Sequence, residues 1–148
     1  MCGQCFARKK RLFSRPSGYV HGCSTRRSCV AGGVVFYANY LKFFERARTE
    51  WLRTLGFSQQ AMRLEDQAMF VVTDTQVRHR QPARLDDLVE VTVRVAERGR
   101  ASLVLEQQAW RDGTLLAEGR IRIGCVDAAS LRPRRMPPAL LSALGLQP

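Results

Sequence analysis

The stretch NYLKFFERARTEWLRTLG, residues 39–56, decides the fold of this chain. Its apolar residues recur at the helical period and form a single stripe: Tyr40, Phe44, Ala47, Trp51 and Leu55. Asn39 suits the N-cap position and Gly56 suits the C-terminal stop. Charged side chains such as Arg46, Glu50 and Arg53 fall on the solvent side. We therefore predict a helix of about 17 residues as the central element.

Downstream of this helix, a second helical stretch at Ser58–Glu65 is followed by a change of the apolar period to two. The alternation predicts four strands, at Ala68–Arg80, around Val89–Val95, at Ser102–Arg111 and around Leu115–Ile123. Asp112-Gly113 and Arg98-Gly99-Arg100 are hairpin signals, and Gln81–Asp87 is a longer loop. The pattern indicates an α+β arrangement, in which an antiparallel sheet wraps around the helix. Because so small a sheet leaves its edges open, we expect a dimer or higher oligomer.

Basic residues are concentrated at the N-terminus. Residues 1–30 hold seven of the 24 Lys and Arg residues and no acid, although the whole chain carries a net charge of +11. Neither a basic folded face nor an aromatic stacking platform is visible, so we expect a solvated basic tail and no nucleic-acid partner. No apolar run approaches the roughly 20 residues of a membrane span, nor does one follow the basic residues as in a signal peptide. We therefore expect no integral membrane segment and a cytoplasmic location.

Four of the five cysteines also lie in the first thirty residues: Cys2, Cys5, Cys23 and Cys29. Cys2 and Cys5 have the spacing of a zinc knuckle, but Cys23 and Cys29 are too far apart for the usual second pair. His21 is an alternative ligand; we nevertheless predict no metal and no cofactor, and a buried structural role for Cys125. We divide the chain into an atypical segment 1–30 with one short strand near Tyr19–His21, a domain 31–135, and a tail 136–148 with a short helix.

A long run from Gly32 to Arg53, GGVVFYANYLKFFERARTEWLR, resembles the 4-hydroxybenzoyl-CoA thioesterase family, in particular the Tol–Pal-associated acyl-CoA thioesterases. The resemblance continues through GFSQQ at 56–60, PARLDD at 82–87, RGRASLV at 98–104, CVD at 125–127 and RPR at 132–134. It covers about 105 residues in consistent order. It implies a hotdog fold paired into homodimers or homotetramers, which hydrolyses acyl-CoA thioesters without a metal or cofactor.

The catalytic acid of that family stands three positions before the second glycine, where this chain has Val30. Residues 1–44 contain no Asp or Glu, and a valine neither attacks a carbonyl nor takes a proton. Three readings follow. The fold is catalytically impaired but still binds acyl-CoA, another group substitutes, or the segment before Ala31 is foreign to the family, for example through a frameshift or altered start.

The candidate site residues take their roles from the same resemblance. The backbone of Gly32, Gly33 and Val34, with the start of the helix, is predicted to polarise the thioester carbonyl. Tyr37 and Glu45 are the candidate catalytic side chains; the alternatives are packing for Tyr37 and pairing with Arg46 or Arg48 for Glu45. Arg100 and Ser102 correspond to a hairpin that faces CoA. His79, between Arg78 and Arg80, reads as a solvated edge residue, and Cys29 has no evident base beside it.

The sequence thus predicts an acyl-CoA thioesterase-like protein with impaired hydrolysis. The alternatives are a non-catalytic module that binds acyl-CoA or an acyl carrier, and a basic, zinc-carrying N-terminal module that recruits nucleic acid or an acidic partner.

Overall fold

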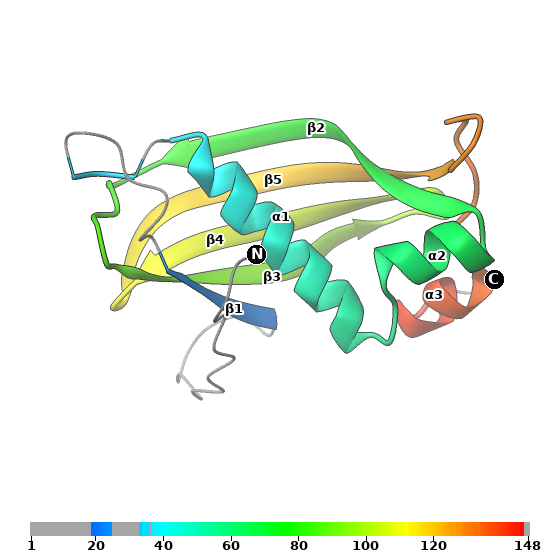
Figure 1. Cartoon of the computed structure of the whole chain (residues 1–148), viewed down its shortest axis with the longest axis horizontal. Helices are drawn as coiled ribbons and strands as arrows, with labels where there is room; N and C mark the ends of the chain where they lie inside the picture. The colour runs from blue at the N-terminus through cyan, green and yellow to red at the C-terminus, as the bar shows by residue number, and fades with distance from the viewer. Residues whose placement is uncertain (1–18, 25–32, 36, 147–148) are drawn as a thin grey trace.

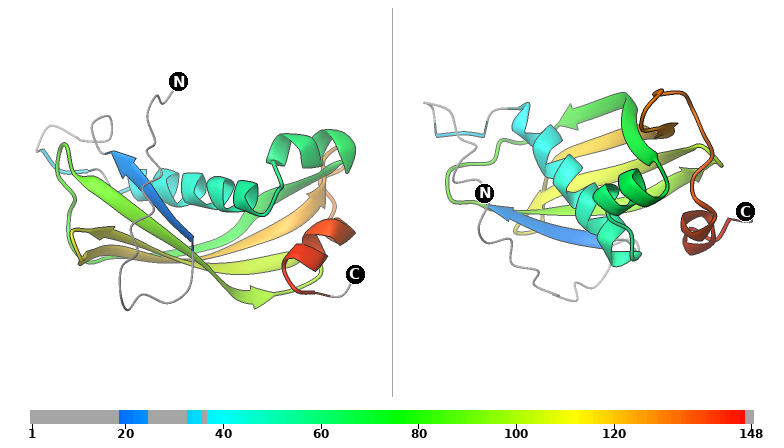
Figure 2. Two further views of the ribbon diagram at one scale, coloured as in Figure 1. Left: turned by 90° about the horizontal axis from the view of Figure 1, so that it is seen from below. Right: turned by 45° about the vertical axis from the view of Figure 1, so that its right-hand side comes forward.

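The computed structural model describes residues 19–24, 33–35 and 37–146; of 19–24 it describes the backbone. Three helices and five strands follow one another along the chain (Figure 1): β1 Tyr19–Ser24, α1 Asn39–Thr54, α2 Gln59–Glu65, β2 Ala68–His79, β3 Leu88–Arg98, β4 Ser102–Arg111, β5 Thr114–Asp127 and α3 Pro138–Ala143. The predicted α+β class is confirmed, and the sheet curves around α1 as in a hotdog fold (Figure 2).

The sheet is antiparallel throughout, with strand order β1-β3-β4-β5-β2. The four strands predicted from alternation are all present, and the short strand expected near Tyr19–His21 extends to Ser24. β1 pairs with β3 in the register Tyr19↔Val93. This pairing joins residues 19–24 to the same sheet as the rest of the domain. β2 forms the other edge among the described strands.

The core lies between α1 and the inner face of the sheet. The stripe of α1 is buried as predicted, except that Leu55 is only partly buried. Valines 89, 91 and 93 of β3 and Ile121 and Ile123 of β5 cover it from the sheet. Because Gly119 has no side chain, the ring of Phe44 sits directly on β5; a Cβ built there would lie 2.9 Å from Phe44 Cε2.

The ends of the elements follow local chemistry, with one correction. Ala38, not Asn39, is the N-cap of α1, and no side chain caps this end. Gly56 ends α1 with a φ of +88°, as predicted, and Ser58 Oγ caps α2 by accepting from the Ala61 N–H at 3.0 Å. Asp112 and Gly113 form the expected tight turn, both with positive φ.

The described residues after 135 contribute apolar side chains to the core. The predicted short helix is present as α3, and four apolar side chains from this region are buried: Met136, Leu140, Leu141 and Leu144. The Met136 N–H donates to the Arg100 carbonyl at 2.8 Å, which holds the segment against the β3–β4 turn. None of the described helices has the length and apolar character needed to cross a membrane.

Candidate functional site

The segment before α1 is attached to the loop that follows β2. The Val35 N–H donates to the Ala83 carbonyl at 2.8 Å, and the Leu85 N–H donates to the Gly33 carbonyl at 3.2 Å. These two bonds flank the bridge between Val34 and Arg84, so Val34 occupies a non-hydrogen-bonded pair and its own N–H points away from the loop. Gly33 has a φ of +74°, which only glycine adopts at little cost. Gly32, Val30 and Cys29 lie outside the described residues.

Tyr40 connects this segment to the helix. Its side chain is buried, and its hydroxyl accepts from the Ala83 N–H at 2.9 Å and donates to the Gln81 carbonyl at 3.5 Å. Burial raises the pKa of the Tyr40 phenol, and the Ala83 N–H partly offsets that rise. Tyr40 is therefore a neutral, fully hydrogen-bonded side chain that positions the loop, and not a proton acceptor.

His79 lies against this tyrosine and against Tyr37. The imidazole centroid is 5.2 Å from the Tyr40 ring and 6.0 Å from the Tyr37 ring, both in edge-to-face geometry. His79 pairs with Ala117, a buried residue of the inner face, whereas Arg78 and Arg80 form ion pairs with Glu118 on the outer face. The prediction of a solvated edge histidine is confirmed, because His79 is exposed and β2 is an edge strand; the structure adds the ring contacts with Tyr37 and Tyr40. The imidazole is exposed, but it lies on the inner side of the sheet over the first turn of α1.

We call Val34, Tyr37, Tyr40 and His79 the α1-start cluster. The N-terminus of α1 lies within it, and neither a side-chain cap nor an acidic residue in the first turn offsets its positive potential. The cluster therefore combines an outward-pointing N–H, a positive helix end and an imidazole. That combination suits an electrophile whose carbonyl oxygen gains negative charge during reaction.

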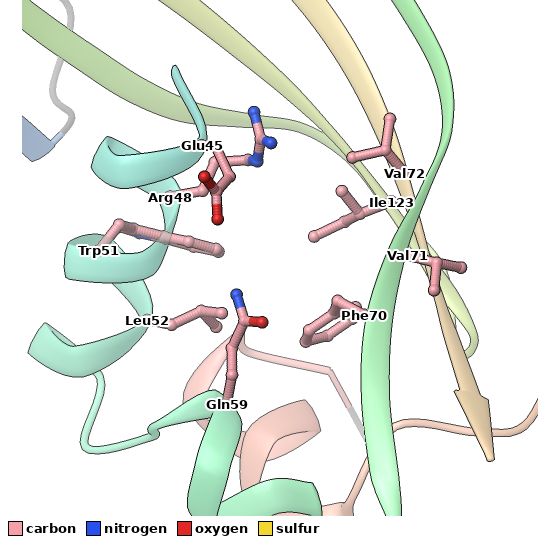
Figure 3. A pocket seen from close by; sticks show the side chains of 9 residues that line it. All are labelled: Glu45, Arg48, Trp51, Leu52, Gln59, Phe70, Val71, Val72 and Ile123. Carbon is pink, nitrogen blue, oxygen red and sulfur yellow. The ribbon is translucent and has the colours of Figure 1, made fainter. Parts of the chain in front are cut away.

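Two adjoining cavities run between α1 and the β2 side of the sheet. One of about 310 Å³ is lined by Leu41, Lys42, Glu45, Arg48, Val72, Thr75 and Ile121. The next, of about 180 Å³, shares Glu45, Arg48 and Val72 and continues to Trp51, Leu52, Gln59, Phe70 and Ile123. Figure 3 shows Trp51 and Leu52 from α1 facing Phe70 and Ile123 across an apolar space, with the Gln59 amide and the Glu45 carboxylate directed toward it.

Arg48 is a buried cation in the wall of both cavities. It is 8% exposed; its Nη1 donates to Gln107 Oε1 at 2.8 Å, and Gln107 Nε2 donates to the Phe44 carbonyl at 2.9 Å. Burial lowers the pKa of Arg48, and the negative charge of Glu45 acts in the opposite direction. Glu45 therefore interacts electrostatically with Arg48, which fits the pairing role considered for it from the sequence.

The predicted site residues do not all come together. Val34 and Tyr37 belong to the α1-start cluster and Gly33 directly precedes Val34, whereas Glu45 lies about 7–8 Å further along α1 than Tyr40. Arg100 and Ser102 are at the opposite end of the sheet, where Ser102 pairs with Gly124 while His79 pairs with Ala117 (Figure 1). Seven residues of β5 separate those two positions, a span of about 24 Å.

The residues considered for zinc cannot be compared with the structure, because the side chains of Cys2, Cys5, His21, Cys23 and Cys29 lie outside its described part. Elsewhere in the described chain, no three metal-ligating side chains gather. Cys125 is buried as predicted, and burial raises the pKa of its thiol.

Comparison with known proteins gives a consistent result. A family model of the thioesterase superfamily matches residues 32–118. The acyl-CoA thioesterase YbgC of Haemophilus influenzae is 42% identical over 113 residues, which are 76% of this chain and 83% of that protein. A probable thioesterase from Bartonella henselae superposes with a TM-score of 0.78 at 26% identity, covering 82% of this chain and 100% of that one. A DHNA-CoA thioesterase from Staphylococcus aureus has a TM-score of 0.81 at 23% identity, covering 86% and 89%, and supports the fold alone.

Proposed function

The chain belongs to the thioesterase superfamily, and from that membership we propose that it hydrolyses acyl-CoA thioesters to the free acid and CoA. The observation that carries this proposal is the position of the α1-start cluster at one end of the apolar cavities along α1. Leu41 of the cavity wall is four residues, about one helical turn, from Tyr37, and Thr75 is four residues, about 13 Å of strand, from His79.

This arrangement supports one orientation of the substrate. The thioester carbonyl lies at the α1-start cluster, where the Val34 N–H and the helix N-terminus stabilise the oxyanion. Gly33, together with Gly32, lets the backbone approach the carbonyl closely. The acyl group follows α1 into the cavities, past Glu45 and Arg48 toward Trp51 and Phe70. The CoA part of the bound substrate then extends into solvent at the open end of the cavities, beside the exposed Tyr37.

Hydrolysis is proposed to be impaired, because residue 30 is a valine where the family has its catalytic acid. Of the two candidate catalytic side chains, Tyr37 belongs to the α1-start cluster, where it contacts His79, and is retained near the thioester. Glu45 faces Arg48 in the cavity wall and is assigned to acyl-group contact rather than to the reacting carbonyl. The same valine favours the alternative function, a module that binds acyl-CoA or an acyl carrier without turnover.

A homodimer is part of the proposal. β2 is a sheet edge whose first half, AMFVVT at 68–73, contains no charged residue and no proline. Antiparallel pairing of β2 with its copy around a two-fold axis places the α1 start of one protomer beside the far end of the other. Arg100 and Ser102 would then serve CoA bound at the partner's site, which accounts for their distance from Tyr37. We also propose a cytoplasmic location, as expected from the sequence, and, from the resemblance, a link to the Tol–Pal system.

The test is a thiol-release assay on short, long and aromatic acyl-CoAs with the wild-type chain and the Val30→Asp variant. Val30→Asn is the matched control, because it has the shape of Asp without the charge. We expect slow hydrolysis by the wild type and at least a tenfold higher kcat in Val30→Asp, but not in Val30→Asn. Acyl-CoA binding without turnover in the wild type and both variants would favour the binding module instead.

A further inference from the structure

We propose that His79 is the proton-accepting group of this chain, activating the water that attacks the thioester carbonyl at the α1 start. The proposal rests on the thioesterase function proposed above and names the residue that performs the base step in the absence of a carboxylate at position 30. It assigns a catalytic role to a histidine that the sequence pattern alone places at a solvated strand edge.

The position of His79 is fixed from three sides. Its backbone pairs with Ala117 in the sheet, and its ring packs edge-to-face on Tyr40 at 5.2 Å and on Tyr37 at 6.0 Å. Tyr40 is itself immobilised by the Ala83 N–H, and Ala83 in turn accepts from the Val35 N–H. The imidazole therefore contacts a tyrosine whose hydroxyl is linked, through the two hydrogen bonds of Ala83, to the segment that carries the Val34 N–H. These contacts connect the proposed base to the proposed oxyanion donor, and general-base catalysis depends on such positioning.

No other described side chain near the carbonyl position suits this step. The Tyr40 hydroxyl already donates and accepts hydrogen bonds, so it is not available to take a proton from water. Glu45 points into the cavity beside Arg48, where the acyl group would lie (Figure 3). An exposed imidazole, by contrast, is an effective base near neutral pH.

The proposed hydrolysis passes through a tetrahedral intermediate. One imidazole nitrogen of His79 takes a proton from water as the water oxygen bonds to the carbonyl carbon, and the carbonyl oxygen becomes an oxyanion facing the Val34 N–H. When the tetrahedral intermediate collapses, the C–S bond breaks and its electron pair stays on sulfur. The imidazolium proton passes to the thiolate, giving the CoA thiol and the acid, which releases its own proton to water. His79 returns to its neutral form.

Few charged groups face the imidazole. From α1 and its preceding turn, the phenols of Tyr37 and Tyr40 face it. Arg78 and Arg80 pair with Glu118 on the other side of the sheet, and Ala117 of β5 carries no charge. Asp87 and Arg111 act on Tyr40 from beyond the loop. If His79 is the base, the pH dependence of kcat should be present in the wild type and absent in His79→Gln.

The experiment measures kcat and KM of the full-length chain between pH 5 and 8 for the wild type, His79→Gln, His79→Ala, Glu45→Gln and Arg78→Gln. Arg78→Gln is the matched control, because Arg78 precedes His79 on β2 but faces the outer side. We expect His79→Gln to lower kcat about 100-fold with little change in KM, and to abolish the pH dependence of kcat. Added imidazole should restore part of the rate of His79→Ala, and melting temperatures should show that the variants fold.

The outcomes separate the two proposals. Wild-type hydrolysis that survives in His79→Gln with an unchanged pH profile overturns the role of His79 and leaves the thioesterase function standing. Loss of activity in Glu45→Gln but not in His79→Gln also overturns the role of His79, and it makes the Glu45 carboxylate the base instead. A wild type that hydrolyses none of the acyl-CoAs overturns both, and equilibrium binding of a non-hydrolysable acyl-CoA thioether then tests the binding alternative. A 100-fold loss with imidazole rescue is the result that supports the proposal.

Discussion

Arg48 occupies an unusual place for a charged residue, because its guanidinium lies between the central helix and the sheet. Gln107 is its neutral partner, fully buried and bonded at both ends of its amide, to Arg48 and to the Phe44 carbonyl. A buried cation is costly unless its hydrogen bonds are satisfied, so the amide and the guanidinium depend on each other.

This dependence predicts non-additive effects on stability. Gln107→Leu leaves the buried guanidinium without its acceptor and should lower the free energy of unfolding by about 2–3 kcal/mol. Arg48→Met leaves the amide oxygen unpaired and should cost about 1–3 kcal/mol. The double variant replaces both groups by apolar ones and should lose at least about 1 kcal/mol less than the sum. Urea denaturation at a single protein concentration measures all three, and additive losses would show that the two side chains do not act as one unit.

His79 also shows where prediction from sequence fails at the scale of one residue. Alternation counted from Phe70 and Val72 places residues 74, 76 and 78 on the inner face. The pairing of β2 with β5 shifts between Val72 and Asp74, and this bulge exchanges the two faces for the rest of the strand. His79 therefore reaches the inner face, opposite Ala117. A single bulge carries no clear signal in the sequence, so the α1-start cluster could not be assembled from the pattern alone.

Whole elements were easier to predict than their ends and partners. The stripe of α1 and the alternation of β4 repeat over ten or more residues, and both elements have the expected bounds to within one residue. The cap of α1 was mispredicted because the chain turns before the helix: the Tyr40 N–H bonds to the Tyr37 carbonyl and the Leu41 N–H to the Ala38 carbonyl. The burial of α3 depends on contacts with the rest of the fold, and its six residues are too few to reveal that burial by periodicity.

The loop after β2 holds the backbone of the site, and Asp87 organises that loop. Its carboxylate accepts from the Arg84 N–H at 2.7 Å and from Arg111 Nη1 at 2.8 Å. Desolvation acts to raise the pKa of Asp87, but these two hydrogen bonds outweigh it, so the pKa lies below its ordinary value. A lowered pKa in the folded state contributes stability above the unfolded-state pKa of about 3.9, and that contribution is lost as the pH falls through the folded-state value.

Asp87→Asn should therefore be less stable than the wild type at pH 7, and the difference should persist down to about pH 5 and shrink below about pH 4. Thermal or urea unfolding across pH 3 to 7 measures it. Asp74→Asn is the control for the loss of one negative charge, because Asp74 is an exposed residue of β2. A difference between wild type and Asp87→Asn that is unchanged at pH 3 would mean that the asparagine disturbs the loop by its shape, not by its missing charge.

At the scale of the whole molecule, the two surfaces of the sheet differ in what they offer a partner. The outer face carries a network of ion pairs, in which Arg94 and Arg120 contact Glu106, and Arg120 and Arg122 contact Glu97. Because these charged side chains are well solvated, burying this face against a partner would contribute little free energy to association. The β2 edge instead combines an apolar strand with the exposed side chains of Val72 and Leu41 at the open cavities. Self-association should therefore use this edge.

The chain should sediment at about twice the 16.8 kDa of one copy, and Val72→Asp should shift it toward monomer. Val72 is 52% exposed on the apolar half of β2, so a carboxylate there would be buried without a partner in the paired state. Leu88→Asp is the matched control, because Leu88 is similarly exposed, at 58%, but belongs to β3, beside β1 at the other edge. If Arg100 of one copy serves the site of the other, monomeric Val72→Asp should also bind CoA more weakly than Leu88→Asp. Sedimentation and CoA titration of the same samples test both points, and a dimer that survives Val72→Asp but not Leu88→Asp would move the interface to the β1 edge.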